Sequence, residues 1–451
     1  MGPDRAELPV WVEGAHERAL SCLARAESAI GGRYGLIRGV WDLASEPDDP
    51  RLFHAVAQTA NCEPLFGRHC HGINGGSGFT AALARASATG EALERYAAAA
   101  HDEAELVRAS YNELVAAEVR ALDPASVPLY SERQYQGPGF PFEPLRAGTR
   151  VGWVWGTSLV SHEPILVPAC LVFIPFEEEF RVVNAISTGL ACDLSPASAA
   201  LSALYEVIER DAIMITWLGE LPAPRVDLEA TTSLGGLLDR VFRPSGLEFR
   251  VNDISTELGI PVAFALAIDE ANDGITLNAG AAANAEPERA IVKALMEAAQ
   301  GRLWLRQEQA EGHLDEILDR NRVATFDDHV RWFGHRRHLH HVDFLSAGPW
   351  GRMGDVAASG GGNGAPEDRL AETVKLLVQQ DLDVIIVDVT PTDVADLGFT
   401  VVKALVPGLV DLNAHHLLPL KGNQRLYDVP ERLGYGHRDE DTLSDVPHPF
   451  P

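Results

Sequence analysis

Two nine-residue stretches of this chain share one polar skeleton, and this repeat constrains the fold more than any other feature. Residues 87–95 read SATGEALER and residues 202–210 read SALYEVIER, so both fit the pattern Ser-x-x-x-Glu-x-x-Glu-Arg. In an α-helix, which advances by about 100° per residue, positions i, i+4 and i+7 lie on one face. Each stretch therefore predicts a helix that presents one serine and two glutamates along a single stripe.

A third helix, expected to begin near Pro287, carries a related stripe of Lys293, Glu297 and Gln300. The residues that flank the paired glutamates of the first two helices are largely apolar, and carboxylates three residues apart repel one another. When partly buried, such carboxylates need a compensating cation, and oxygen ligands on rigid helices suit Mg²⁺ together with substrate phosphates. The spacing thus predicts a metal or phosphate site without specifying a reaction. Solvated helix faces with incidental Glu–Arg neighbours are the alternative interpretation.

Charge and composition exclude several classes of partner. The formal net charge of −28 argues against nucleic acid, because binding to phosphates requires a basic face. No apolar run in the sequence is long enough to span a bilayer, and the first residues, MGPDRAELPV, lack the pattern of a secretory signal. The five cysteines are scattered and form no Cys-x-x-Cys pair, which argues against a disulfide framework and a structural zinc site. We therefore expect a cytoplasmic protein without a nucleic-acid or membrane partner.

The alternation of helical and strand-like patterns indicates an α/β or mixed α+β protein. We expect an N-terminal helical extension over residues 1–30 and one large domain over residues 31–451. The main elements expected within this domain are a glycine-rich loop over 72–80, a helix from about 81 to 120, a turn-rich loop over 184–196, a helix over 196–217 and strands over 261–268, 274–283 and 383–390. Four histidines cluster in residues 334–341, but their spacing matches no standard zinc pattern, so we interpret this stretch as a solvated or interfacial basic turn.

Three segments carry the polar stripes in a fixed order, namely GGSGFTAALARASATGEALERY, STGLACDLSPASAALSALYEVIERDA and ERAIVKALMEAAQGR. In this order they resemble the three ATP-binding segments of the YcaO family. The downstream VDVTPTDVADLGFTVVKALVPGLVDL is similar to the C-terminal half of that family, so the resemblance covers about residues 30–451. The chain ends in Pro-His-Pro-Phe-Pro, and in this family a Pro-x-Pro-x-Pro ending marks the azoline-forming cyclodehydratases of peptide natural-product biosynthesis.

The resemblance implies a YcaO-like fold and a nucleotide site in which glutamates hold Mg²⁺ against the triphosphate of ATP. No Walker P-loop sequence occurs in the chain, so an ordinary P-loop enzyme is not supported. The residues that match the family's metal-binding carboxylates are Glu91, Glu94, Glu206 and Glu209. The residues that match positions near the nucleotide are Ser87, Ser187, Lys293, Glu297 and Gln300, with Ser187 the weaker match.

Two positions depart from the family pattern. Related cyclodehydratases commonly carry Gly-Lys-Gly where this chain has Gly76-Ser77-Gly78, and they carry arginine where this chain has Lys293. The first change removes a cation that faces phosphate. The second replaces a group that can contact phosphate through two parallel hydrogen bonds.

The implied reaction is ATP- and Mg²⁺-dependent cyclodehydration of a ribosomally synthesised precursor peptide, of the kind found in antibiotic biosynthesis. A Cys, Ser or Thr side chain attacks the preceding carbonyl, the oxyanion takes the γ-phosphate, and loss of phosphate leaves a thiazoline or oxazoline. The resemblance also implies that the carboxylate of Pro451 acts in proton transfer, with the prolines stiffening the tail in an extended conformation.

The same resemblance implies partners. Only about 30 residues precede the YcaO-like part, so we expect a separate leader-peptide-binding protein, related to ubiquitin-activating enzymes, that delivers the precursor peptide. A flavin dehydrogenase would oxidise azoline to azole, and the family suggests a homodimer. Two alternatives stay open: a YcaO-type enzyme that makes thioamides or amidines, and a non-catalytic scaffold that binds nucleotide or peptide within a synthetase complex.

Overall fold

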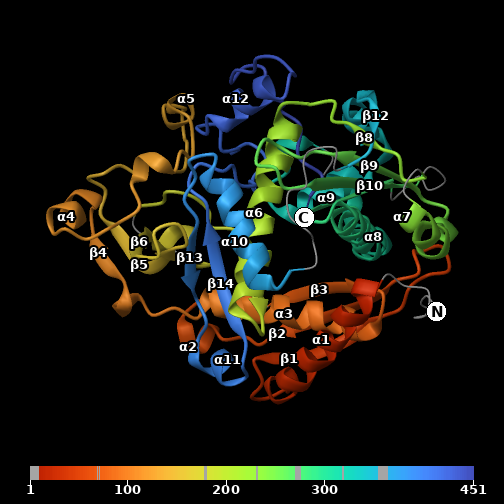
Figure 1. Cartoon of the computed structure of the whole chain (residues 1–451), viewed down its shortest axis with the longest axis horizontal. Helices are drawn as coiled ribbons and strands as arrows, with labels where there is room; N and C mark the ends of the chain where they lie inside the picture. The colour runs from red at the N-terminus through yellow and green to blue at the C-terminus, as the bar shows by residue number, and fades with distance from the viewer. Residues whose placement is uncertain are drawn as a thin grey trace.

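A computed structural model describes residues 10–68, 70, 72–176, 180–229, 232–269, 276–316, 319–353 and 364–450. The described residues form three separate sheets that surround three long helices. The long helices are α3 (Ala81–Ala99), α6 (Pro196–Leu218) and α8 (Pro287–Glu311). In Figure 1, α6 stands in the middle of the molecule, and sheets lie on either side of it and below it.

The first sheet is a small antiparallel one with the order β1-β2-β3. The second has the order β4-β5-β13-β14-β7, with β6 paired to β5, and the third has the order β11-β10-β9-β8-β12. The strands of the first sheet are β1 (Ile37–Leu43), β2 (Phe53–Thr59) and β3 (Ile73–Gly78). Those of the second are β4 (Val107–Ala109), β5 (Val151–Ser158), β6 (Pro164–Pro168), β7 (Leu190–Asp193), β13 (Ile385–Asp388) and β14 (Thr400–Leu405). Those of the third are β8 (Arg225–Val226), β9 (Glu248–Asp253), β10 (Val262–Ile268), β11 (Leu277–Ala283) and β12 (Trp350–Gly351).

Shorter helices cover the outside of these sheets. They are α1 (Val10–Ala26), α2 (Glu63–Phe66), α4 (Tyr111–Ala116), α5 (Glu132–Tyr135), α7 (Thr232–Leu237), α9 (Phe326–Gly334), α10 (Pro366–Val378), α11 (Thr392–Asp396) and α12 (Arg425–Arg432). The N-terminal α1 packs along α3, and the ring nitrogen Nδ1 of His16 lies 2.9 Å from the hydroxyl of Thr80. Within the described part of the chain, no helix has the length and apolar character needed to cross a membrane.

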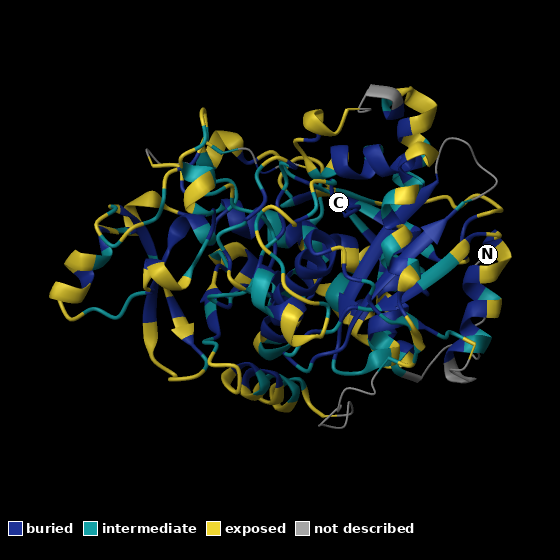
Figure 2. Cartoon of the chain, turned by 90° about the horizontal axis from the view of Figure 1, so that it is seen from above, coloured by how far each residue is buried: buried dark blue, intermediate teal, exposed yellow. Residues whose placement is uncertain are grey.

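Two of the three long helices, α3 and α6, begin at a side-chain cap. Thr80 caps α3 by accepting a hydrogen bond from the Leu83 amide, and Ser195 caps α6 in the same way with proline as the first helical residue. The helix α6 is apolar around most of its circumference, which is typical of a helix enclosed by other elements. Figure 2 shows the consequence, because the dark blue buried residues gather in the strands and helices at the centre of the molecule.

Several expectations from the sequence hold, and others are wrong. The helices α6 and α8 and the strands β10 and β11 lie where the patterns predicted them. The glycine-rich residues 72–80, expected as a loop, form β3, which pairs along its whole length with β2. The helix expected to run to about residue 120 ends at Ala99, and a capping box at Ser110 and Glu113 starts a separate helix, α4. The turn-rich loop over 184–196 contains β7. This strand pairs with β14, a contact that no local sequence pattern predicts.

The histidine stretch over 334–341, interpreted as a solvated or interfacial basic turn, is helical and only partly exposed. It lies at the end of α9 and in a 3₁₀ helix over Arg336–Ala347. His338 is buried and stacks on Trp332, with ring centroids 3.7 Å apart. Residues 354–363, in the glycine-rich stretch over 346–368, lie outside the described residues.

Candidate active site

Each long helix accepts a hydrogen bond from the backbone segment that precedes it. In every case the acceptor is the glutamate at the middle position of the predicted polar stripe, and the donor is a backbone amide in or just before an edge strand. The pairs are Gly75 to Glu91 (3.0 Å), Gly189 to Glu206 (3.2 Å) and Ala281 to Glu297 (3.0 Å). The sequence separations of 16, 17 and 16 residues are nearly equal, so the three strand–helix units are built alike.

The third position of each stripe connects its helix to the strand of another unit. Glu94 on α3 accepts a hydrogen bond of 2.8 Å from the amide of Cys192 on β7. Glu209 on α6 accepts one from the backbone of Ala283 on β11. Gln300 on α8 accepts one of 2.8 Å from the hydroxyl of Ser77 on β3. The packing of the helices agrees with these hydrogen bonds: α3 contacts β7, α6 contacts β11 and α8 contacts β3. The three units therefore close into a ring.

Glycine permits the close approach of strand and helix in this ring. A side-chain carbon on Gly76 would lie 2.3 Å from the carbonyl oxygen of Ala84 and 2.4 Å from the amide nitrogen of Ala88. A carbon on Gly280 would lie 2.4 Å from the equivalent two backbone atoms of α8. Only glycine fits where two backbones come this close.

Exposure decreases along each stripe. Ser87, Ser202 and Lys293 are exposed at the outer end. The side chain of Glu206 is 26% exposed and that of Glu209 is 11% exposed. Each stripe thus runs from an exposed residue at its outer end to less exposed residues at its inner end.

Burial changes the ionisation of these carboxyl groups. It raises the pKa of Glu94 to about 8, and the nearby charges of Glu91 and Glu206 add to this effect. Burial also raises the pKa values of Glu206, Glu209 and Glu297. Keeping this many carboxylates charged in one place requires cations.

Protein cations compensate for only part of this charge. Arg95 lies 3.3 Å from Glu91, and Arg210 lies 3.6 Å from Glu206 and 3.5 Å from Glu209. The buried Nε and Nη1 atoms of Arg210 make no hydrogen bond with any described residue. Carboxylate oxygens with raised pKa values fit Mg²⁺, and unused guanidinium donors beside them fit phosphate oxygens. The residues present are therefore suited to a Mg²⁺–nucleotide complex.

The structure places both residues that depart from the family pattern. Ser77 does not leave its side chain free for phosphate, because its hydroxyl contacts both Gln300 and the ring of His54 at 2.8 Å. Burial lowers the pKa of His54 to about 4, so this ring supplies no positive charge. Lys293 stays exposed at the outer end of its stripe.

Two cations near the site were not found by sequence reasoning. Arg369 on α10 has a buried Nε atom without a hydrogen-bond partner among the described residues, although its Nη2 lies 3.4 Å from Asn284. Lys403 on β14 donates a hydrogen bond of 2.7 Å to the carbonyl of Ile186, and burial lowers the pKa of Lys403 to about 8. The only sign of Lys403 in the sequence is that a lysine interrupts the apolar run VVKALV.

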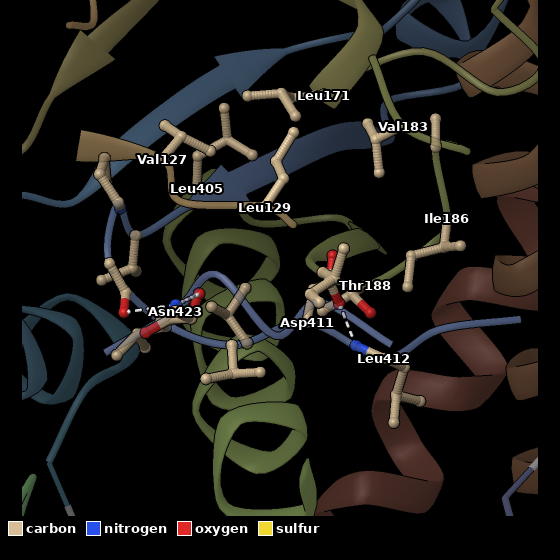
Figure 3. Close-up of a pocket in the computed structure, with 18 of the residues that line it drawn as sticks. Val127, Leu129, Leu171, Val183, Ile186, Thr188, Leu405, Asp411, Leu412 and Asn423 are labelled. Carbon is tan, nitrogen blue, oxygen red and sulfur yellow. Dashed lines mark hydrogen bonds between the residues drawn. The ribbon is translucent and has the colours of Figure 1, made fainter. Parts of the chain in front are cut away.

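A cavity of about 100 Å³ adjoins this part of the site (Figure 3). Thr188, Lys403 and Asp411 form its polar end, and the Thr188 hydroxyl donates a hydrogen bond to Asp411. The remaining walls are mainly apolar, and Figure 3 shows Leu129, Leu171, Val183, Ile186 and Leu405 around the space. The predicted nucleotide residue Ser187 is half-buried in the turn between Ile186 and Thr188.

Pro451, the predicted catalytic residue, lies outside the described residues. The residues just before it are held in the interior, since Phe450 is completely buried. The structure brings together the stripe residues of all three helices. The last described residues of the chain lie against α6 and α9 (Figure 1).

A ring of helix-borne carboxylates with buried guanidinium donors defines a class of site for Mg²⁺ and nucleotide that needs no P-loop. A family model described as YcaO cyclodehydratase, ATP- and Mg²⁺-binding, matches residues 75–410. The chain belongs to the YcaO family. It is accordingly an ATP-dependent enzyme of the cyclodehydratase type, with ATP and Mg²⁺ as its cofactors.

Known proteins resemble the chain over most of its length. A protein of Methanothermobacter thermautotrophicus is 28% identical over 348 residues, which are 75% of this chain and 81% of that protein. A heterocyclase solved in complex with substrate and cofactor gives a TM-score of 0.76 at 22% identity, and the match covers 96% of this chain but 57% of the heterocyclase. YcaO from Methanopyrus kandleri, bound with AMPPCP and Mg²⁺, gives a TM-score of 0.62 at 20% identity and covers 88% and 91% of the two chains. These matches confirm the predicted YcaO-like fold.

Proposed function

We propose that this protein converts Cys, Ser or Thr residues of a ribosomally synthesised precursor peptide into thiazolines or oxazolines at the expense of ATP. The observation that carries the proposal is the closed ring of three strand–helix units. It brings Glu91 and Glu94 close to Glu206. Arg210 pairs with Glu206 and Glu209 and keeps buried guanidinium nitrogens without a hydrogen bond to any described residue. Membership of the YcaO family supports the same reaction.

The proposed reaction balances as a dehydration driven by phosphoryl transfer. The side-chain sulfur or oxygen of the substrate attacks the preceding carbonyl carbon and loses its proton. The resulting oxyanion takes the γ-phosphoryl group of ATP, and ADP leaves. The amide nitrogen then loses its proton, the carbon–oxygen bond breaks, and inorganic phosphate departs with the original carbonyl oxygen. Bound Mg²⁺ neutralises negative charge that develops on the phosphates.

Each group of residues has a proposed role in this reaction. The four paired glutamates hold Mg²⁺, and Ser87, Ser187, Lys293, Glu297 and Gln300 lie around the nucleotide. Arg210 and Arg369 offer unused guanidinium nitrogens to phosphate oxygens, which offsets the missing lysine at Ser77. The carboxylate of Pro451 takes up one of the released protons.

The substrate and partners belong to the same proposal. The apolar cavity beside Thr188 and Lys403 supports a peptide substrate, since such a space accommodates an apolar side chain next to the reacting amide. A separate leader-binding protein delivers the precursor, a flavin dehydrogenase oxidises the azoline, and the enzyme acts as a homodimer in the cytoplasm.

Intact mass spectrometry of a precursor peptide tests the proposal. The peptide, rich in Cys and Ser, is incubated with the protein, its leader-binding partner and Mg-ATP. We expect the peptide to lose the mass of one water per ring, and the Glu94→Gln variant to form no product. Glu105→Gln, which changes an exposed glutamate, is the matched control and retains activity. A gain equal to sulfur replacing oxygen would identify a thioamide synthetase instead. Unchanged product formation by Glu94→Gln would support the scaffold alternative.

A further inference from the structure

The C-terminal segment, residues 446–450, lies against α6 and α9 rather than extending into solvent. The carbonyl of Val446 accepts a hydrogen bond of 3.0 Å from the indole nitrogen of Trp217 on α6. Phe450 is completely buried and packs against Phe264, with ring centroids 4.9 Å apart. Between these two anchors, His448 stacks on His329 of α9 at a centroid distance of 3.8 Å and an angle of 14°. We call His329 and His448 the histidine clasp.

His329 contacts two carbonyl groups through its two ring nitrogens. Nδ1 donates to the carbonyl of His448 at 2.8 Å, and Nε2 lies 3.1 Å from the carbonyl of Ala414. The ring is completely buried, and burial lowers the pKa of His329 to about 4, so it is neutral and carries one proton. The shorter contact assigns this proton to Nδ1, the nitrogen that holds the C-terminal segment.

His448 makes a hydrogen bond at each of its two ring nitrogens. Its Nδ1 accepts a hydrogen bond of 3.3 Å from the amide of Phe450, which leaves its proton on Nε2. Nε2 donates to the carbonyl of Asn413 at 3.0 Å. The ring of His448 is therefore fixed to the turn that contains Asn413. His448, which occupies an x position of the Pro-x-Pro-x-Pro ending, thus anchors the C-terminal segment.

The clasp lies close to the carboxylate ring. Trp217 and Arg210 are seven residues apart on α6 and share one face of that helix. After burial and the neighbouring His329, the charge of Arg210 is among the causes that lower the pKa of His448. The same guanidinium group pairs with Glu206 and Glu209. The segment is thus anchored on α6 at Trp217, about two helical turns from Arg210.

We infer that His329 is a positioning residue, which through the histidine clasp holds the C-terminal segment beside Arg210 so that the chain end is available to the reaction. This inference rests on the proposed function for its catalytic consequence. The anchoring itself depends only on the contacts described above.

Digestion of the full-length protein with carboxypeptidase Y, followed over time by intact mass, measures the anchoring. In the wild type we expect trimming to stop before the buried Phe450. In His329→Ala, the loss of a buried hydrogen bond and a stacked ring should make trimming through Phe450 about tenfold faster or more. His338→Ala is the matched control, because His338 is a buried histidine stacked on an aromatic ring away from the segment.

Conservative variants separate positioning from a general loss of packing. The side-chain nitrogen of asparagine occupies the place of Nδ1, and that of glutamine the place of Nε2. We therefore expect His329→Asn to keep trimming slow and to retain ring formation, whereas His329→Gln behaves like His329→Ala. Thermal stabilisation by Mg-ATP should change little in all of these variants, because the carboxylate ring is intact. Ring formation should fall about tenfold or more in His329→Ala.

Trimming of His329→Ala at the wild-type rate, or equal trimming of the Asn and Gln variants, would overturn the inference. Ring formation by His329→Ala at the wild-type rate despite fast trimming would also overturn it. If the wild type forms no rings at all, the proposed function fails, and the trimming rates still decide whether the clasp holds the segment.

Discussion

The hydroxyl of Ser77 on β3 donates a hydrogen bond of 2.8 Å to the side-chain oxygen of Gln300 on α8, across 223 residues of sequence. This bond joins the third strand–helix unit to the first. The corresponding positions on the other two helices are occupied by Glu94 and Glu209, which accept backbone amides. At Ser77 the chain carries a residue that closes the ring.

Removal of the Ser77–Gln300 hydrogen bond should lower the stability of the fold. In Ser77→Ala we expect a loss of about 1 kcal/mol in the free energy of unfolding, because one partly buried hydrogen bond disappears. Urea unfolding in the absence of nucleotide measures the change. Ser126→Ala, which alters an exposed serine, should cost much less. Equal costs for the two variants would show that the Ser77–Gln300 bond contributes nothing to the ring.

A methyl group at Gly76 should separate β3 from α3. Because the added carbon would approach two backbone atoms of α3 within 2.4 Å, Gly76→Ala should destabilise the protein by about 1–3 kcal/mol or more. The matched control is Gly72→Ala, since a carbon there meets no atom within 4 Å. Urea midpoints of the two variants provide the comparison, and a stable Gly76→Ala protein would contradict the tight strand–helix contact.

The sequence predicted the stripes of this site but not their closure into a ring. Periodicity identifies which side chains share a helix face, so the stripes of α3, α6 and α8 were predictable. The ring depends on backbone amides such as those of Gly75 and Cys192, and every residue carries the same amide. For the same reason the glycine-rich β3 resembled a loop, since its glycines serve close packing against α3 and not a turn.

Other parts of the site depend on long-range contacts that no local pattern records. Lys403 lies in an apolar run, and only the pairing of β14 with β7 places it beside Ile186. Arg369 follows a glycine-rich stretch without helical or strand periodicity. The end of α3 at Ala99 was predictable in principle, because Ser110 and Glu113 form a capping-box signature that an Ala-rich run obscured.

Neutralisation of Glu94 should separate stability from metal binding. Burial disfavours the charged form of this carboxyl group, so Glu94→Gln should melt at a temperature equal to or higher than the wild type without metal. The stabilisation that Mg-ATP gives the wild type should be lost, and turnover should fall about a hundredfold or more. Thermal unfolding with and without Mg-ATP, and ATP hydrolysis, measure these effects. Strong Mg-ATP stabilisation of Glu94→Gln would exclude Glu94 as a metal ligand.

The stability of the metal-free protein should decrease as the pH rises from about 5 to about 8. In the folded protein Glu94 keeps its proton up to a pKa of about 8, whereas in the unfolded chain its pKa is near 4.5. Between these values the folded state binds more protons, so rising pH favours unfolding, by at most about 1.4 kcal/mol per pH unit for one such group. Urea unfolding in a chelator across this range measures the slope. The slope should be smaller in Glu94→Gln, and a stability that rises with pH in the wild type would contradict the account.

The most direct test of the proposed reaction follows the fate of one oxygen atom. A precursor peptide is synthesised with a heavy-oxygen label in the carbonyl that precedes a reactive cysteine, and it is incubated with the protein, its leader-binding partner and Mg-ATP. Phosphorylation of that oxygen predicts that each ring formed releases one labelled inorganic phosphate. Label in the released water, or retained in a modified peptide, would contradict the account.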